Sequence, residues 1–265
     1  RMIHSKTFLI SAIAASLIII ADVVAWFLLY LQGIDVDTSI FYKWLGVNRG
    51  MNAGVYFFIA LPLLTAFAYS WSVSYDRNSG YISQIITRTS RKKYFTAKFL
   101  VTFISGGIIF AGALILDYVL LAIFSPAYTP IPGDLASSMD PFHFCSEIFY
   151  QNPYLFMLIW FGIAFLWGGA MSCISMAAGM LIKKYVISSI VPFLVFTAEQ
   201  ILALYVMQRY TITIKGTSIG LVWTDMLYAA PMMTSFPEHI LLCIALIIMI
   251  STLIYILRGR KYECL

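Results

Sequence analysis

Six long runs of apolar residues divide this chain, and each run is long enough to cross a bilayer as a helix. A hydrocarbon core of about 30 Å takes roughly 20 helical residues. The runs are continuous rather than alternating, and this excludes a transmembrane β-barrel. They predict an all-α polytopic membrane protein with six transmembrane helices, folded as a single transmembrane domain over residues 1–265. The predicted spans cover residues 7–31, 53–75, 98–124, 154–182, 185–207 and 239–257.

The composition supports this class, because 61% of the 265 residues are hydrophobic and only 11% are charged. The first run is too long for the core of a signal peptide, and no small-residue cleavage site follows it. We therefore expect residues 7–31 to form a retained helix. Only Lys183 and Lys184 separate the fourth and fifth runs, which predicts a tight antiparallel helical hairpin.

The lysines and arginines gather on one side of the predicted spans. Thirteen of the 17 lie before the first span, in the segment 76–98, between the fourth and fifth spans, or after the last span. By the positive-inside rule, both termini and the segment 76–98 are predicted to be cytoplasmic. The net charge of +5 then reflects topology and requires no nucleic-acid partner. The four basic residues on the other side are Lys43, Arg49, Arg209 and Lys215.

Two connecting segments are predicted to lie outside the cell. Residues 125–153 carry five prolines, which break long helices, although a short helix over residues 142–150 is predicted. Residues 32–52 form a modest external loop with polar breaks in its apolar pattern. The aromatic residues of that loop suit the outer membrane interface, namely Phe41, Tyr42 and Trp44.

Residues 219–236 form an external hydrophobic element before the last span. This element is too short and too broken to cross the bilayer twice, yet too apolar for a solvated loop. It predicts a re-entrant or interfacial helical pair that dips into the outer leaflet. The alternative is a helix packed on the extracellular faces of its neighbours.

Three acidic residues lie inside apolar spans, where a charge at the centre of a helix costs about 2.5–3.5 kcal/mol. They are Asp22 in the first span, Asp117 in the third and Glu199 in the fifth. Each should face protein, water or a partner. One hypothesis is that the three line a polar substrate pathway open to the outer half of the membrane. The alternative is that they form interhelical hydrogen bonds.

The segment Asp76–Lys98 is basic and lies between two membrane spans. Inside it, a short amphipathic helix is predicted, suited to a groove in another protein or to the lipid headgroups. One side of this helix is apolar and the other is polar. The apolar side carries Tyr81, Ile82, Ile85 and Ile86, and the polar side carries Ser83, Gln84, Thr87 and Arg88.

Motifs for catalysis are absent from the sequence. There is no phosphate-binding loop of the G-x-x-x-x-G-K-[ST] kind, so ATP hydrolysis by that route is excluded. There is no H-E-x-x-H motif, the three histidines are scattered, and the four cysteines fall on different sides and depths. We therefore expect no enzyme activity, no metal and no disulfide framework.

Small residues cluster in the third and fourth spans. Glycines at 106, 107 and 112 in the third span, and at 162, 168, 169 and 179 in the fourth, leave little side-chain volume between helices. Such residues let membrane helices approach closely, although small-residue patterns are common in apolar helices and identify no particular interface.

The segment 76–98 resembles the cytoplasmic loop of ABC-2 type transporter permeases, the six-span membrane subunits of bacterial exporters. In that family an acidic residue, a glycine, a short apolar helix, a Ser-Arg pair, an aromatic residue and a lysine follow one another into the third span. Outside this loop the resemblance is one of architecture only. The matching positions are Asp76, Gly80, Ile82–Ile86, Ser90–Arg91, Tyr94 and Lys98.

The resemblance implies a coupling helix that docks on a separate ATP-binding subunit. Two copies of that ATPase would bind ATP and Mg²⁺, and this chain would bind no cofactor itself. It would pair with a second permease, identical or related, in the bacterial plasma membrane, and would move a peptide, a lipid-like molecule or a drug. An alternative is a non-transporting sensor or immunity scaffold that binds a peptide at its outer loops. The implied coupling residues are Gly80, Tyr81, Ile82, Ile85, Ile86 and Arg88.

Overall fold

The computed structural model describes an all-helical bundle with one small hairpin. Among the residues that the structure describes, five helical segments are long and apolar enough to cross a membrane. The described residues are 2, 5–34, 38–47, 52–133, 145–182, 184–209, 212–214, 217–219 and 237–260. The long helices are α1 (Lys6–Leu31), α3 (Asn52–Tyr69) with α4 (Trp71–Asn78), α6 (Arg91–Leu121), α8 (Pro153–Leu181), α9 (Tyr185–Arg209) and α11 (Pro237–Arg260). The short elements are α2 (Ile40–Lys43), α5 (Tyr81–Ile86), α7 (Ser146–Gln151), β1 (Ile212–Ile214) and β2 (Thr217–Ile219).

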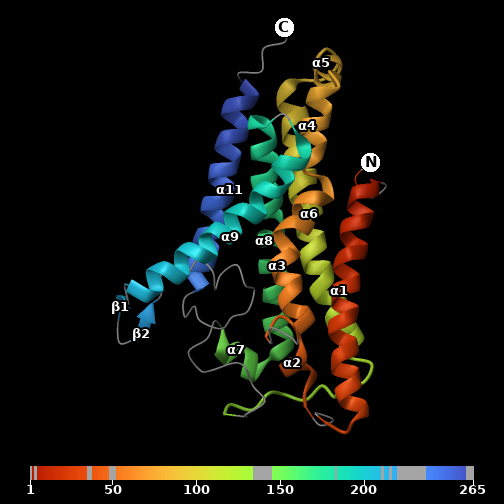
Figure 1. The fold of residues 1–265 in the computed structure, drawn as a ribbon, viewed down its shortest axis with the longest axis vertical. Helices are drawn as coiled ribbons and strands as arrows, with labels where there is room; N and C mark the ends of the chain where they lie inside the picture. The colour runs from red at the N-terminus through yellow and green to blue at the C-terminus, as the bar shows by residue number, and fades with distance from the viewer. Residues whose placement is uncertain are drawn as a thin grey trace.

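The helices α1, α3, α6, α8 and α11 run side by side along the long axis of the molecule (Figure 1). The short helix α5 lies at one end of this bundle, called here the α5 end. The helices α2 and α7 lie at the opposite end, called here the α2 end (Figure 1). The order of elements follows the predicted spans, so consecutive long helices cross the bundle in alternating directions.

Helix α9 departs from this arrangement. It slants away from the other helices and leads to the β1–β2 hairpin (Figure 1), whose antiparallel register pairs Ile212 with Ile219. The apolar part of α9 that is described in full, Tyr185–Ala198, is shorter than a membrane span. Five of the six predicted spans are thus confirmed as long apolar helices, whereas the fifth, residues 185–207, stays a prediction.

The boundaries of several elements differ from those predicted. The second span is divided at Ser70 into α3 and α4, although the two together form one apolar segment over Tyr56–Asn78. Helix α6 begins at Arg91, seven residues before the predicted start of the third span. The short helix expected at 142–150 is α7. The external hydrophobic element at 219–236 lies outside the described residues, apart from Ile219 at the end of β2.

Large apolar side chains point outward along the bundle. In α1, Ile10 is 65% exposed and Leu17 is 62% exposed, and α11 presents Leu242 and Met249 in the same way. Soluble proteins rarely expose continuous apolar faces of this length. The arrangement is that of helices whose outer faces meet lipid, so the structure supports a multi-pass membrane protein.

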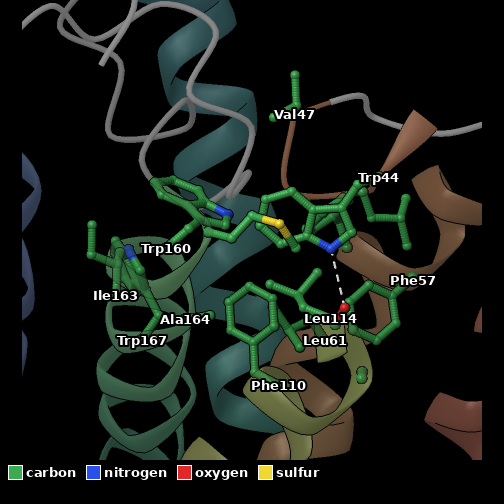
Figure 2. Packing of buried hydrophobic residues seen from close by; sticks show 14 of the residues in the cluster. Trp44, Val47, Phe57, Leu61, Phe110, Leu114, Trp160, Ile163, Ala164 and Trp167 are labelled. Atoms are coloured by element: carbon green, nitrogen blue, oxygen red, sulfur yellow. Dashed lines mark hydrogen bonds between the residues drawn. The ribbon is translucent and has the colours of Figure 1, made fainter. Parts of the chain in front are cut away.

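The core extends to the α2 end, where the loop after α1 folds into the bundle. Trp44 is fully buried, and its indole N–H donates to the carbonyl oxygen of Leu114 at 3.1 Å (Figure 2). The expectation that Phe41, Tyr42 and Trp44 lie at the outer interface is therefore wrong. These side chains fill the space between α3, α6 and α8, where burial of a large aromatic ring contributes more than an interfacial position does.

The small residues of the third and fourth spans lie where α6 crosses α8. A Cβ atom added at Gly106 would collide with the side chain of Ser172 and the backbone of Gly168. A Cβ atom added at Gly168 would in turn meet the backbone of Gly106. The two helices therefore cross with their backbones in direct contact, and this crossing fixes α6 against α8.

Candidate functional site

The most unusual feature of the α5 end is a buried ion pair between the last turn of α4 and the first turns of α6. Lys98 Nζ lies 2.6 Å from Asp76 Oδ2, and both side chains are almost completely buried. The hydroxyl of Tyr94 donates to the same carboxylate oxygen at 2.7 Å. One carboxylate thus receives two donors from successive turns of α6.

Aromatic rings complete the surroundings of the Lys98 ammonium group. Its nitrogen lies 5.3 Å from the ring centre of Tyr69 and 5.9 Å from that of Tyr94. Cation–π attraction of this kind is stronger where water is excluded. The lysine is therefore held by a carboxylate on one side and by two ring faces on others, which restricts it to one position.

A small apolar cluster surrounds the ion pair and brings in the last helix. Its buried members are Val73, Met176, Met180 and Tyr255, with Phe95 and Phe99 packed against them. The hydroxyl of Tyr255 donates to the carbonyl oxygen of Phe95 at 3.2 Å, and the two rings meet edge to face. Helices α4, α6, α8 and α11 therefore all meet around the Asp76–Lys98 pair.

Between the two charged residues the chain leaves the bundle and returns. Gly80 ends α4 with a φ of 70°, a left-handed conformation that glycine adopts at little cost. Helix α5 follows at once, and Ser90 then starts α6 with extended backbone. These two turns return the chain to the bundle.

The side chains of α5 divide into an inner and an outer set. Ile82 is only 2% exposed and packs toward the protein, whereas Tyr81 is 38% exposed. Gln84 and Arg88 are also exposed, and Ile85 is half-buried. The side chain of Ile86 lies outside the described residues. The outward face of this segment is therefore formed by Tyr81 and Gln84 of α5 and by Arg88 just after its end, with Ile85 at its margin.

A second contact ties α4 to the end of α8. The Arg77 guanidinium donates to the carbonyl oxygens of Met180 and Ile182 at 3.2 and 2.8 Å. These carbonyls belong to the last turn of α8, where an unpaired oxygen attracts a cation. The residue next to Asp76 thus fixes α4 to the start of the α8–α9 hairpin.

The acidic residues proposed for a substrate pathway are placed differently from the ion pair. Asp22 and Asp117 are both completely buried near the α2 end, close enough to interact electrostatically. Asp117 Oδ2 accepts a hydrogen bond from the backbone N–H of Leu45 at 2.9 Å. Asp117 therefore anchors the loop that carries Trp44, a contact to a loop backbone rather than the interhelical hydrogen bond considered as the alternative. Glu199 lies in α9, and its side chain falls outside the described residues.

Lys43, counted among the outer basic residues, is buried in the loop that Asp117 anchors. Its ammonium group lies 3.3 Å from Ser125 Oγ and 5.9 Å from the ring centre of Trp26. The loop that carries Lys43 also pairs with residues 126–131, since Ser39 Oγ donates to the carbonyl oxygen of Tyr128 at 2.8 Å. At the α2 end, residues 38–47 therefore pack against residues 125–131 through polar contacts.

Neither cluster has the composition of a catalytic or metal centre. Among the described residues, no group of three histidine, cysteine or acidic side chains is placed to hold a metal ion. The Asp76 carboxylate is occupied by a lysine and a tyrosine, and it is buried between α4 and α6. The contacts at the α5 end instead hold the two ends of the α5 segment together.

Sequence reasoning identified Asp76, Tyr94 and Lys98 as separate positions of a pattern but did not predict that they touch. Tyr94 and Lys98 follow Asp76 by 18 and 22 residues, and a helix, a glycine turn and a second helix fit into that interval. Such a sequence of elements can bring the chain back beside Asp76. The roles of Arg77 and Tyr255 have no comparable signal in one sequence. Comparison with family models, curated proteins and solved structures finds no match to this chain.

Proposed function

We propose that this chain is the membrane-spanning permease subunit of an ATP-driven ABC-2 type exporter in a bacterial plasma membrane. The observation that carries the proposal is an exposed helix, α5, mounted on a buried ion pair between two membrane-spanning helices. Helix α5 would act as the coupling helix and dock into a groove on a separate ATPase subunit. The ATPase, in two copies, binds ATP and Mg²⁺, and this chain catalyses no reaction.

The ion pair gives this proposal its mechanism. When two ATPase subunits close around ATP, each carries its docked coupling helix with it. A flexible loop would absorb that displacement. Because Asp76 and Lys98 join the two ends of the segment at 2.6 Å, the displacement passes into α4 and α6 instead. The membrane helices then tilt, and the tilt changes access to the substrate path.

The docking face in this proposal is the outward face of α5. Tyr81 and Ile85 supply apolar contact, and Arg88 supplies a cation two residues after the end of α5. Ile82 belongs to the inner set, so it supports α5 from below rather than contacting the partner. Gly80 sets the angle at which α5 leaves α4.

The rest of the assembly follows from the same family pattern. The α5 end and both termini would be cytoplasmic, since the basic residues gather there. Helix α9 would form the fifth of the six spans, and a second permease, identical or related, would complete the transport pathway. An amphipathic substrate, whether peptide, lipid-like molecule or drug, would enter from the membrane side.

The test is co-purification with the ATPase encoded beside this gene. The chain and the ATPase are expressed together, and the ATPase retained on the tagged permease is measured. Tyr81→Asp combined with Ile85→Asp should abolish retention, because two charges replace the apolar docking contacts. Ile131→Asp is the matched control, since Ile131 is 62% exposed but lies after α6 near the α2 end. Undiminished ATPase binding by the double variant would overturn the coupling-helix assignment.

The alternative function, a sensor or immunity scaffold that binds a peptide at its outer loops, has weaker support. Residues 38–47 pack into the core at the α2 end, and their aromatic side chains are buried rather than presented. A scaffold of this kind would also need no ATPase. The two proposals therefore separate in the same experiment, through the presence or absence of a co-purifying ATPase.

A further inference from the structure

A groove runs between α6 and α11 at the α5 end of the bundle. Its cavity measures about 620 Å³. Arg91 and Lys92 stand at its mouth, and apolar side chains line its length. Those from α6 include Phe99 and Leu100, and those from α11 include Tyr255 and Ile256. The groove is therefore cationic at one end and apolar along the rest.

The dimensions of this groove correspond to one leaflet of a bilayer. From Arg91 to Leu100 the helix rises nine residues, or about 13–14 Å at 1.5 Å per residue. Half of a hydrocarbon core of about 30 Å is about 15 Å. Leu100 and Ile256 are both about half exposed, so the groove opens on the lipid-facing side of the bundle. A cation at the headgroup level and an apolar channel of one leaflet's depth together match one phospholipid.

The charges at the mouth favour an anionic headgroup. Helix α6 starts with Arg91, Lys92 and Lys93 and has no acidic residue in its first turn. Three cations at the positive end of a helix dipole repel both the dipole and one another. The Arg91 guanidinium lies 6.0 Å from the ring centre of Phe95, which holds its stem against the groove wall. A phosphate at this place would offset the local excess of positive charge.

We propose that this groove binds one anionic phospholipid, with its phosphate at Arg91 and Lys92 and an acyl chain between α6 and α11. The site goes beyond the proposed transport function and does not depend on it. Its back wall is Tyr255, which bonds to the backbone of Phe95 next to Tyr94. A bound lipid therefore supports the apolar cluster that surrounds the Asp76–Lys98 pair, and links the base of α5 to membrane composition.

The experiment measures lipids bound to the purified chain, without any ATPase, by native mass spectrometry. The detergent micelles contain equal amounts of phosphatidylglycerol and phosphatidylcholine. Attraction near a membrane surface is worth about fivefold per Lys or Arg, so two cations predict a preference of about thirtyfold for phosphatidylglycerol. Arg91→Gln with Lys92→Gln should bring the preference close to one. Lys93→Gln is the matched control, because Lys93 is an exposed cation on the same turn outside the groove lining, and it should keep the preference.

A second pair of variants tests the apolar part of the site. Thr252→Trp fills the groove from α11 and should remove bound lipid of both kinds. Leu253→Trp adds a similar ring at the next position, where the side chain is 56% exposed outside the groove, and should retain lipid. Equal loss in Lys93→Gln and in the double glutamine variant would overturn the site, as would full retention in Thr252→Trp. Retained lipid together with loss of a dimer in Thr252→Trp would assign the groove to a second copy of the chain instead.

Discussion

Neutralising one member of the Asp76–Lys98 pair is the most direct perturbation of the α5 end. Asp76→Asn keeps the shape of the side chain and its acceptor for Tyr94, but leaves the Lys98 ammonium without its counterion. Lys98→Met keeps the apolar stem and leaves the Asp76 carboxylate buried with only the tyrosine donor. Removing one partner of a buried ion pair costs about 3–5 kcal/mol, because the remaining charge stays desolvated.

This loss of unfolding free energy can be converted to a decrease in melting temperature. In a chain of this size, 1 kcal/mol lowers the melting temperature by about 2–4 °C, so each single variant should melt about 6–20 °C below the wild type. Tyr94→Phe loses one hydrogen bond to a charged group, worth about 1.5–3 kcal/mol, and should fall by about 3–12 °C. The six tryptophans provide an intrinsic fluorescence signal for the unfolding curve in detergent.

The double variant Asp76→Asn with Lys98→Met decides whether the two charges act on each other. Removing both charges leaves two polar or apolar groups of similar volume, an exchange that is often close to neutral. The melting temperature of the double variant should therefore be well above the value expected from adding the two single losses. Lys93→Met, an exposed position on the same helix, should stay within about 0.5 kcal/mol of the wild type. Single variants that melt like the wild type, or strictly additive losses, would refute the conclusion that the buried Asp76–Lys98 pair stabilises the α5 end.

Three further changes test the contacts that hold the bundle. Gly106→Val should destabilise the chain by at least about 1–3 kcal/mol by forcing α6 away from α8, whereas Gly112→Val, with nothing within 4 Å, should be tolerated in the same melting assay. Asp117→Asn should remain stable because an amide oxygen still accepts the backbone N–H at the α2 end, while Asp117→Leu should lose about 1–3 kcal/mol. If Asp117→Asn abolishes transport at normal stability, Asp117 belongs to the substrate pathway after all. Arg77→Gln should raise amide hydrogen exchange at the end of α8, where two carbonyl oxygens lose their donor, and exposed Arg88→Gln should not.

The spans could be predicted from the sequence because lipid imposes a requirement that local pattern alone satisfies. About 20 consecutive apolar residues are needed for a helix to cross the bilayer core, and the five confirmed helices read directly from that rule. The same rule does not predict which face of a helix is buried in the protein, because an apolar residue is equally stable against lipid and against protein. Trp44 shows the consequence, because its aromatic side chain was assigned to the outer interface and lies in the core. The charge count likewise placed Lys43 on the outer side but could not show that its side chain is buried.

The contacts of the candidate site were beyond the sequence for a different reason. A carboxylate and a lysine 22 residues apart on opposite sides of a loop read as two solvated charges. Only the reversal at Gly80, the short α5 and the start of α6 at Ser90 bring them to 2.6 Å. The partner of Phe95 comes from the last helix, Tyr255, and no local pattern connects two residues 160 positions apart.

The direction in which a displacement of α5 travels follows from the contacts below the ion pair. Helix α4 is joined to α8 by Ser70 and Ser175, whose hydroxyl oxygens lie 2.6 Å apart, and by Ser74, which donates to the carbonyl oxygen of Gly179 at 3.2 Å. Helix α6 is locked to α8 where the glycines cross. Helix α1 is held at this end by contacts to Thr7, which accepts from the indole of Trp71 at 2.7 Å. Because α4 and α6 both contact α8, we expect a displacement of α5 by a docked partner to move these three helices together. The α8–α9 hairpin, which Arg77 joins to α4, would then follow.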